Sequence, residues 1–221
     1  MERRIFVVFT IICILSFLTS CDISAALTGN GNTTQAQSGD LLFQDTFSDS
    51  TGGWDTWVEN SSIVDYNTDG LRFYINEPHF DFWSRPKKEF RDVLIDVLTT
   101  KVSGPDDNNF GLICRYKNRD NFYSFLISSD GYYGIMKVID GQHELLSAQK
   151  LQYSEIIHKG GATNRLQVEC NGSNLIFSVN GQKLAVVQDA DIPSGGVGLI
   201  VGSYEIPGVD ILFDNFIVYQ P

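Results

Sequence analysis

Basic residues are scarce in this sequence. Its 221 residues include 16 Lys and Arg against 27 Asp and Glu, which gives a formal net charge of −11 at pH 7. Nucleic-acid-binding proteins neutralise phosphates with clusters of Lys and Arg, and an acidic surface repels both phosphates and anionic lipid headgroups. The composition therefore argues against a nucleic-acid partner and against direct adsorption to an anionic membrane.

The sequence also lacks an apolar run long enough to span a bilayer. The longest run covers about 14 residues (5–18), whereas a membrane helix needs about 20. Two arginines precede it, and the small residues of the segment LTSC (18–21) follow it. A positive start, a short apolar core and a small-residue site predict a secretory signal peptide over residues 1–20.

The segment LTSC resembles the lipobox of bacterial lipoproteins. The resemblance implies that the Cys21 thiol carries diacylglycerol and that cleavage makes Cys21 the mature N-terminus. Two or three acyl chains on one residue hold a protein on a membrane, whereas a single chain is marginal. The alternative is an ordinary secretory signal followed by an unrelated cysteine. The resemblance predicts a bacterial protein, lipid-anchored at the cell surface or on the periplasmic side of the membrane.

Residues 22–39 contain no aromatic side chain and are rich in Gly, Asn, Thr, Gln and Ser. Such a composition cannot bury enough apolar surface to fold. With Cys21, this segment is predicted to be a flexible linker (21–39). The remaining residues, 40–221, have the length of one domain.

This domain lacks the 3.6-residue periodicity of amphipathic helices. Its apolar residues instead follow the two-residue period of strands in ten segments: 71–75, 93–102, 110–116, 121–128, 132–139, 164–170, 174–181, 183–188, 197–202 and 209–219. Turn pairs such as Asp130-Gly131 and Asn180-Gly181 separate them. The pattern predicts an all-β protein, a two-sheet antiparallel β-sandwich or jelly roll.

Four stretches, 41–54 (LLFQDTFSDSTGGW), 104–138, 164–187 and 195–219, have the order of an opening strand, central hairpins and closing strands. Together they resemble the concanavalin A-like lectin/glucanase fold in its laminin-G-like and sugar-hydrolase-associated variants. The resemblance implies two sheets, one of them bent, with a concave face that holds carbohydrate in many relatives. It does not fix the function, because one fold hosts many functions.

Only two cysteines fall within the domain, Cys114 and Cys170, each in a strand-like segment. Outside the cytoplasm such a pair can form a disulfide. The alternative is two buried cysteines that act as small apolar side chains. The sequence leaves both open.

Recognisable catalytic motifs are missing. Glycosidases need two carboxylates across the scissile bond, and the glucanase branch of this fold carries them as Glu-x-Asp-x-Glu, which this sequence lacks. It also lacks a Gly-x-Ser-x-Gly elbow and zinc-type histidine spacing. We therefore favour a non-catalytic role and predict no certain cofactor. A structural calcium ion is a further hypothesis, with Asp45 and Asp214 as ligands if the first and last strands pair.

Aromatic side chains are the strongest binding signal, because sugar rings stack on them while neighbouring polar groups hold the hydroxyls. In HFDFW (79–83), alternation places His79, Asp81 and Trp83 on one face. We predict an exposed carbohydrate-binding cluster consisting of Trp57, Trp83, Arg115, Tyr123 and Tyr133. The alternatives are a glycoside-processing enzyme and a protein-interaction module.

Overall fold

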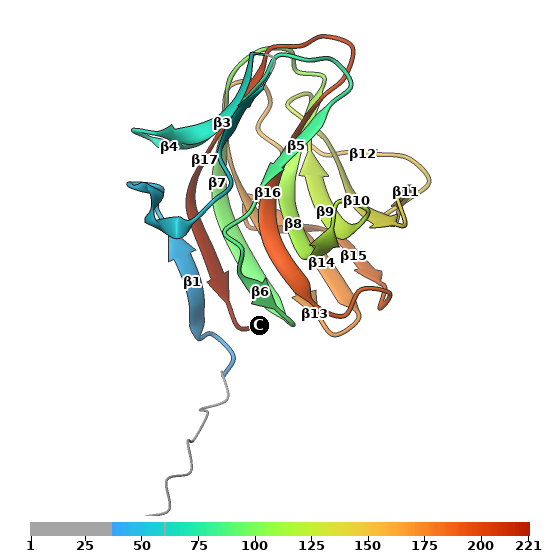
Figure 1. The fold of residues 1–221 in the computed structure, drawn as a ribbon. Coiled ribbons are helices and arrows are strands. Elements are labelled where there is room, and N and C mark those ends of the chain that lie inside the picture. The colour runs from blue at the N-terminus through green and yellow to red at the C-terminus, as the bar shows by residue number, and fades with distance from the viewer. Residues whose placement is uncertain (1–36, 60) are drawn as a thin grey trace, which may run out of the picture. The chain divides into compact units, whose positions relative to one another are not determined.

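The alternating segments assemble into two antiparallel sheets in the computed structural model, which describes residues 37–59 and 61–221 (Figure 1). All ten predicted segments are strands, so the predicted all-β two-sheet sandwich is confirmed. In this described part of the chain, no helix is long and apolar enough to cross a membrane. The predicted signal peptide, Cys21 and most of the linker lie outside the described residues.

The first sheet has nine strands in the order β15-β14-β13-β7-β17-β4-β3-β2, and β1 pairs with β17. Its strands are β1 (Leu41–Asp45), β2 (Trp57–Glu59), β3 (Ser62–Asn67), β4 (Gly70–Ile75), β7 (Val93–Ser103), β13 (Thr163–Asn171), β14 (Asn174–Val179), β15 (Gln182–Gln188) and β17 (Val209–Tyr219). Leu41 pairs with Tyr219, and the Gly39 N–H donates to the Gln220 carbonyl oxygen at 2.8 Å. The first and last strands of the domain therefore lie side by side.

The second sheet has eight strands in the order β11-β10-β9-β8-β16-β5, with β12 paired to β10 and β6 paired to β16. Its strands are β5 (Asp81–Ser84), β6 (Glu89–Phe90), β8 (Asn108–Asn118), β9 (Asn121–Ile127), β10 (Tyr132–Ile139), β11 (Gln142–Leu145), β12 (Gln152–Tyr153) and β16 (Gly195–Ser203). A short 3-10 helix, Ser50–Gly52, follows β1.

The core fills the space between the two sheets. Inward positions carry buried apolar side chains, such as Val97 of β7, Leu166 of β13 and Phe125 of β9. Burying one such side chain stabilises the fold by about 1.5–3 kcal/mol. The strand periodicity thus encodes the sandwich, because each sheet has an apolar face that only the other sheet can cover.

A disulfide crosses this core. It joins Cys114 of β8 to Cys170 of β13, one from each sheet and 56 residues apart in the sequence. Both cysteines are fully buried. The pairing that the sequence left open is therefore present, and it is typical of a protein that folds in an oxidising compartment.

Directly after Cys114, β8 contains a bulge. Ile113 pairs with Gly198 and Tyr116 with Gly196, so two residues of β8 oppose one residue of β16. Arg115, within the bulge, has a left-handed φ of +54°. Because of the extra residue, Tyr116 lies with Ile113 on the outer face of the sheet, whereas Cys114 faces the core.

We expect that replacing both Cys114 and Cys170 with Ala lowers the free energy of unfolding by about 2–5 kcal/mol, because the unfolded chain loses a long cross-link. Urea denaturation of the variant without reductant measures the effect. The wild type in reducing buffer provides the control and is expected to unfold at a similarly reduced midpoint. Equal midpoints for the oxidised wild type and the variant would contradict the prediction.

Candidate functional site

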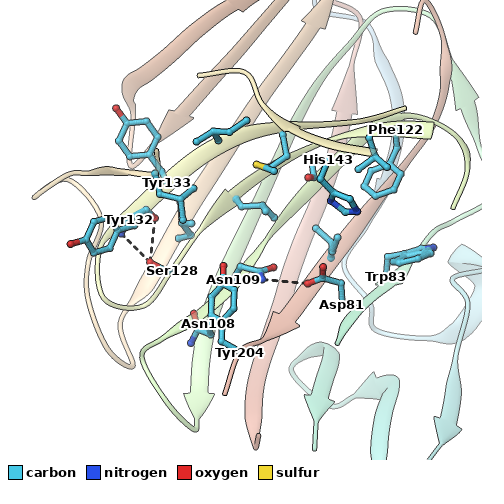
Figure 2. Close-up of a pocket in the computed structure, with 18 of the residues that line it drawn as sticks. Asp81, Trp83, Asn108, Asn109, Phe122, Ser128, Tyr132, Tyr133, His143 and Tyr204 are labelled. Atoms are coloured by element: carbon cyan, nitrogen blue, oxygen red, sulfur yellow. Dashed lines mark hydrogen bonds between the residues drawn. The ribbon is translucent and has the colours of Figure 1, made fainter. Parts of the chain in front are cut away.

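The outer face of the eight-stranded sheet holds a hollow of about 540 Å³ (Figure 2). Six strands contribute to its walls: β5, β16, β8, β9, β10 and β11. The side chains that line the hollow include Asp81, Trp83, Asn109, Phe122, His143 and Tyr204. They come from distant parts of the sequence and meet because the sheet brings their strands together.

Strand register explains the floor of this hollow. One row of paired residues crosses five strands and consists of Trp83, Ile200, Gly111, Leu126 and Gly134. Two of these five positions are glycines, and the side chains of Leu145 and Leu151 cover Gly134. The row is therefore apolar, with an indole ring at its β5 end.

Trp83 belongs to an aromatic group on this outer face. Its ring centroid lies 6.3 Å from that of Tyr116 and 6.0 Å from that of Phe122. The Arg85 guanidinium lies 3.9 Å from the Tyr116 centroid and covers that ring. Trp83 itself is half-buried, so part of its indole surface faces the hollow. Such a surface suits the apolar face of a ring-shaped ligand.

Polar groups stand beside this aromatic surface. The Asn109 Nδ2 donates to Asp81 Oδ1 at 3.3 Å, as the dashed line in Figure 2 marks. Asp81 is open to the hollow, yet the protein atoms around it desolvate the carboxylate and raise the pKa of Asp81 above its usual value. The Asn109 hydrogen bond and the nearby His143 oppose that rise. Burial likewise raises the pKa of Tyr204.

Of the five aromatic and basic residues predicted to bind sugar, Trp83 and Tyr133 line the hollow. The Tyr133 hydroxyl donates to the Leu184 carbonyl oxygen of the other sheet at 3.1 Å, so its ring packs toward the core. Trp57 lies outside the hollow, on β2 of the nine-stranded sheet. Its ring packs on Phe82 with a centroid distance of 4.3 Å.

Arg115 and Tyr123 do not belong to an exposed cluster, so this part of the prediction is wrong. Their exposed fractions are 2% and 0%. The bulge in β8 turns Arg115 inward, where its guanidinium donates to the Ile192 and Gly172 carbonyl oxygens at 3.0 and 2.6 Å. Without the bulge, strict alternation along β8 would place Arg115 on the outer face with Ile113.

Tyr123 faces the core because it is one of the alternate residues of β9 whose side chains point toward the other sheet. Its hydroxyl donates to Asp189 and accepts from the Ile192 N–H at 3.1 Å. Burial raises the pKa of Tyr123 above its usual value. The side chain of the neighbouring Phe122 points to the outer face of the sheet and lines the hollow instead. The predicted exposure of Tyr123 is wrong because the face of β9 that carries Tyr123 meets the other sheet.

The two aspartates proposed as calcium ligands do not fit that role. Asp45 accepts from the Phe47 N–H at 2.7 Å and from the Trp54 Nε1–H at 2.9 Å, using both oxygens. Asp214 likewise accepts from the backbone and side-chain amides of Asn215. Across residues 37–59 and 61–221, no three His, Cys, Asp or Glu side chains gather to hold a metal ion.

Sequence reasoning did not single out Asn109, Phe122 or Tyr204. The alternation of β8 carried a usable signal, since Asn109, Gly111 and Ile113 share its outward face. For Tyr204 no local pattern exists, because this residue follows β16 in a loop. Its place in the wall depends on pairing between strands far apart in the sequence.

We expect Tyr123→Phe to lower the free energy of unfolding by about 1–3 kcal/mol, because it leaves the Ile192 N–H and Asp189 without their buried partner. Ligand binding in the hollow should not change, since the ring lies on the opposite face of the sheet. Urea denaturation measures the loss, with Tyr132→Phe, at an exposed position, as the matched control. Equal stability of the two variants would refute this account of Tyr123.

No protein-family model matches the chain, and no curated protein matches it. Solved structures do. A carbohydrate-binding module, CBM66 from Bacillus subtilis, aligns with TM-score 0.61 at 15% identity over 76% of this chain and 96% of its own. A Bacillus licheniformis β-glucanase aligns with TM-score 0.58 at 11% identity, over 85% and 100%.

The GH43 protein BlXynB from Bacillus licheniformis aligns with TM-score 0.63 at 13% identity, over 82% of this chain but 40% of its own. At such identities the likeness establishes the fold alone. The described domain has the concanavalin A-like lectin/glucanase β-sandwich fold.

Proposed function

We propose that this protein is an extracytoplasmic lipoprotein whose β-sandwich binds carbohydrate without catalysing its cleavage. One observation carries the proposal: a half-buried indole, Trp83, lies in a hollow beside a hydrogen-bonded Asp81–Asn109 pair. Its volume of about 540 Å³ lies in the range of small-ligand sites, which are mostly apolar with a few placed polar groups. Solved structures with this fold include a carbohydrate-binding module and a β-glucanase, and this supports a sugar ligand.

The mechanism is stacking combined with hydrogen bonding. The apolar face of a sugar ring lies on the Trp83 indole, whose other contacts with Phe122 and Tyr116 hold it in place. Asp81 and Asn109 then accept hydrogen bonds from the hydroxyls at the rim of that ring. Because the site is an open hollow along the sheet, it suits a segment of a polysaccharide.

The proposed location outside the cytoplasm draws on two independent features. The buried Cys114–Cys170 disulfide is typical of oxidising compartments. The leader that precedes Cys21 predicts export and acylation, and acyl chains supply the membrane contact that an acidic chain cannot obtain from anionic lipid.

A glycoside-processing enzyme is the second candidate, favoured by the raised pKa of Asp81, which would suit a general acid. Hydrolysis needs a second carboxylate roughly 5–10 Å away. The other carboxylate lining the hollow, Asp120, lies in the turn after β8, whereas Asp81 lies beside the start of that strand. Eleven residues of strand, with a path of roughly 30 Å, run between the two ends, so Asp120 does not supply that second carboxylate.

A protein-interaction module would need no such hollow. The combination of an indole, an apolar floor and adjacent hydrogen-bonding groups is a feature of ligand sites, and it favours a small repeating ligand over a protein surface.

We expect Trp83→Ala to abolish retardation of the full chain by a glycan in affinity electrophoresis, because the stacking surface is lost. The chain is extracted in neutral detergent and run against a panel of β-glucan, xylan, galactan and fructan. Trp57→Ala is the matched control, since it removes a tryptophan outside the hollow. Retention of binding by Trp83→Ala would count against this site, and release of sugar products by the wild type would count against a non-catalytic role.

The anchor is tested separately. We expect Cys21→Ser to move the protein from the membrane fraction to the soluble fraction, and to abolish labelling by a radioactive fatty acid. Cys13→Ser, within the leader, is the matched control and should leave both unchanged. A membrane-bound, labelled Cys21→Ser protein would exclude acylation at this residue.

A further inference from the structure

Three residues at the β5 end of the hollow form one row across the sheet. Asp81 of β5 and Asn109 of β8 both pair with Gly202 of the strand between them, β16. Gly202 has no side chain, and a Cβ atom there would overlap the side chains of Asp81 and Asn109. The glycine therefore allows two polar side chains to meet above the middle strand, on the side of the hollow.

The Asn109 amide is more than nine-tenths buried, with an exposed fraction of 8%. Its Nδ2 donates to Asp81, but its Oδ1 has no hydrogen-bond partner among the described residues. A buried acceptor without a donor is costly, and such atoms mark places where a ligand or water completes the structure. Within the same described part of the chain, Asn109 is also the one side chain that hydrogen-bonds Asp81.

The Asp81–Asn109 pair therefore offers hydrogen-bond acceptors, a carboxylate and an amide oxygen, to the donor groups of a ligand. Trp83 lies two residues from Asp81 on the same face of β5, a spacing of about 7 Å along a strand. A single ring stacked on Trp83 thus reaches the acceptor pair with the groups at its edge.

The charged side chains around the hollow further restrict the class of ligand that it can bind. The hollow contains the carboxylates of Asp81 and Asp120, and Arg119 lies 3.6 Å from Asp120 and partly balances it. A smaller hollow, which shares Tyr132 and Tyr204 with the first, adds three carboxylates from Asp107, Asp130 and Glu205. A carboxylated or sulfated sugar would meet electrostatic repulsion from these carboxylates, whereas a sugar without acidic groups brings hydroxyl donors and no opposing charge.

We propose that Asp81 and Asn109 form a specificity subsite that accepts hydrogen bonds from two neighbouring hydroxyl groups of a sugar unit that carries no acidic group and stacks on Trp83. This inference rests on the proposed function and deepens it, because it names the ligand class as a glycan without acidic groups and with adjacent free hydroxyls.

The test compares galactan with polygalacturonate, which carries a carboxylate on each unit. The remaining neutral glycans of the panel, β-glucan, xylan and fructan, are run beside them. Affinity electrophoresis of the full chain measures the wild type, Asp81→Asn and Asn109→Leu. Both substitutions keep the side-chain size and remove acceptor capacity, so we expect each to weaken binding of a neutral glycan by at least about tenfold.

Gly202→Ala should abolish binding, because the added methyl group displaces both acceptors, whereas Gly161→Ala has only one ordinary contact and should bind as the wild type does. Thermal unfolding checks the folding of each variant. If Gly202→Ala does not fold, Asp81→Asn and Asn109→Leu still decide the question.

The outcomes separate the two proposals. Weaker binding in Asp81→Asn and Asn109→Leu, with a neutral glycan preferred, supports the subsite. Unchanged binding in both variants, together with loss in Trp83→Ala, overturns the subsite and leaves the proposed function standing. Tighter binding of polygalacturonate than of any neutral glycan overturns the assignment to sugars without acidic groups. No retardation by any glycan overturns both proposals.

Discussion

The register of β8 is the constraint on which both the core and the hollow depend. All but the last two residues of this strand are buried, because inward side chains meet the other sheet and outward ones form the floor of the hollow. A slip of one residue would exchange the two faces. It would also move Cys114 away from Cys170 and Asn109 away from Gly202. The disulfide therefore secures the alignment that assembles the polar pair.

The fold could be predicted almost completely from alternation and turn chemistry. Segments such as 164–170 have one apolar and one polar face, and only a sheet satisfies that pattern. Short edge strands escaped the pattern, because β2 and β11 have three and four residues and little burial to shape their composition. The disulfide was suggested but not decided, since strand order is a property of the whole fold.

The site could be predicted only in part, and the reasons are specific. Asp81 and Trp83 share a face on a short, regular strand, so local alternation placed them correctly. The predicted exposure of Arg115 is wrong because the segment FGLICRY (110–116) gives no sequence signal for the bulge in β8. Tyr123 was misplaced because both faces of β9 carry apolar residues, and composition does not tell which face meets the second sheet. Asn109 can be recognised as a site residue only once its pairing with Gly202 of the neighbouring strand is known.

The pairing of β1 with the end of β17 has a consequence for how this domain could travel between genes. The chain enters and leaves at one place on the nine-stranded sheet, while the hollow belongs to the other sheet. A unit whose ends adjoin can be inserted into a host chain or appended to it without disturbing its interior. The part of the GH43 protein BlXynB that aligns with this chain makes up 40% of that protein, as expected for a fold that can be joined to other domains. A domain joined to other chains in this way keeps its hollow open, because the hollow belongs to the sheet that carries neither end of the domain.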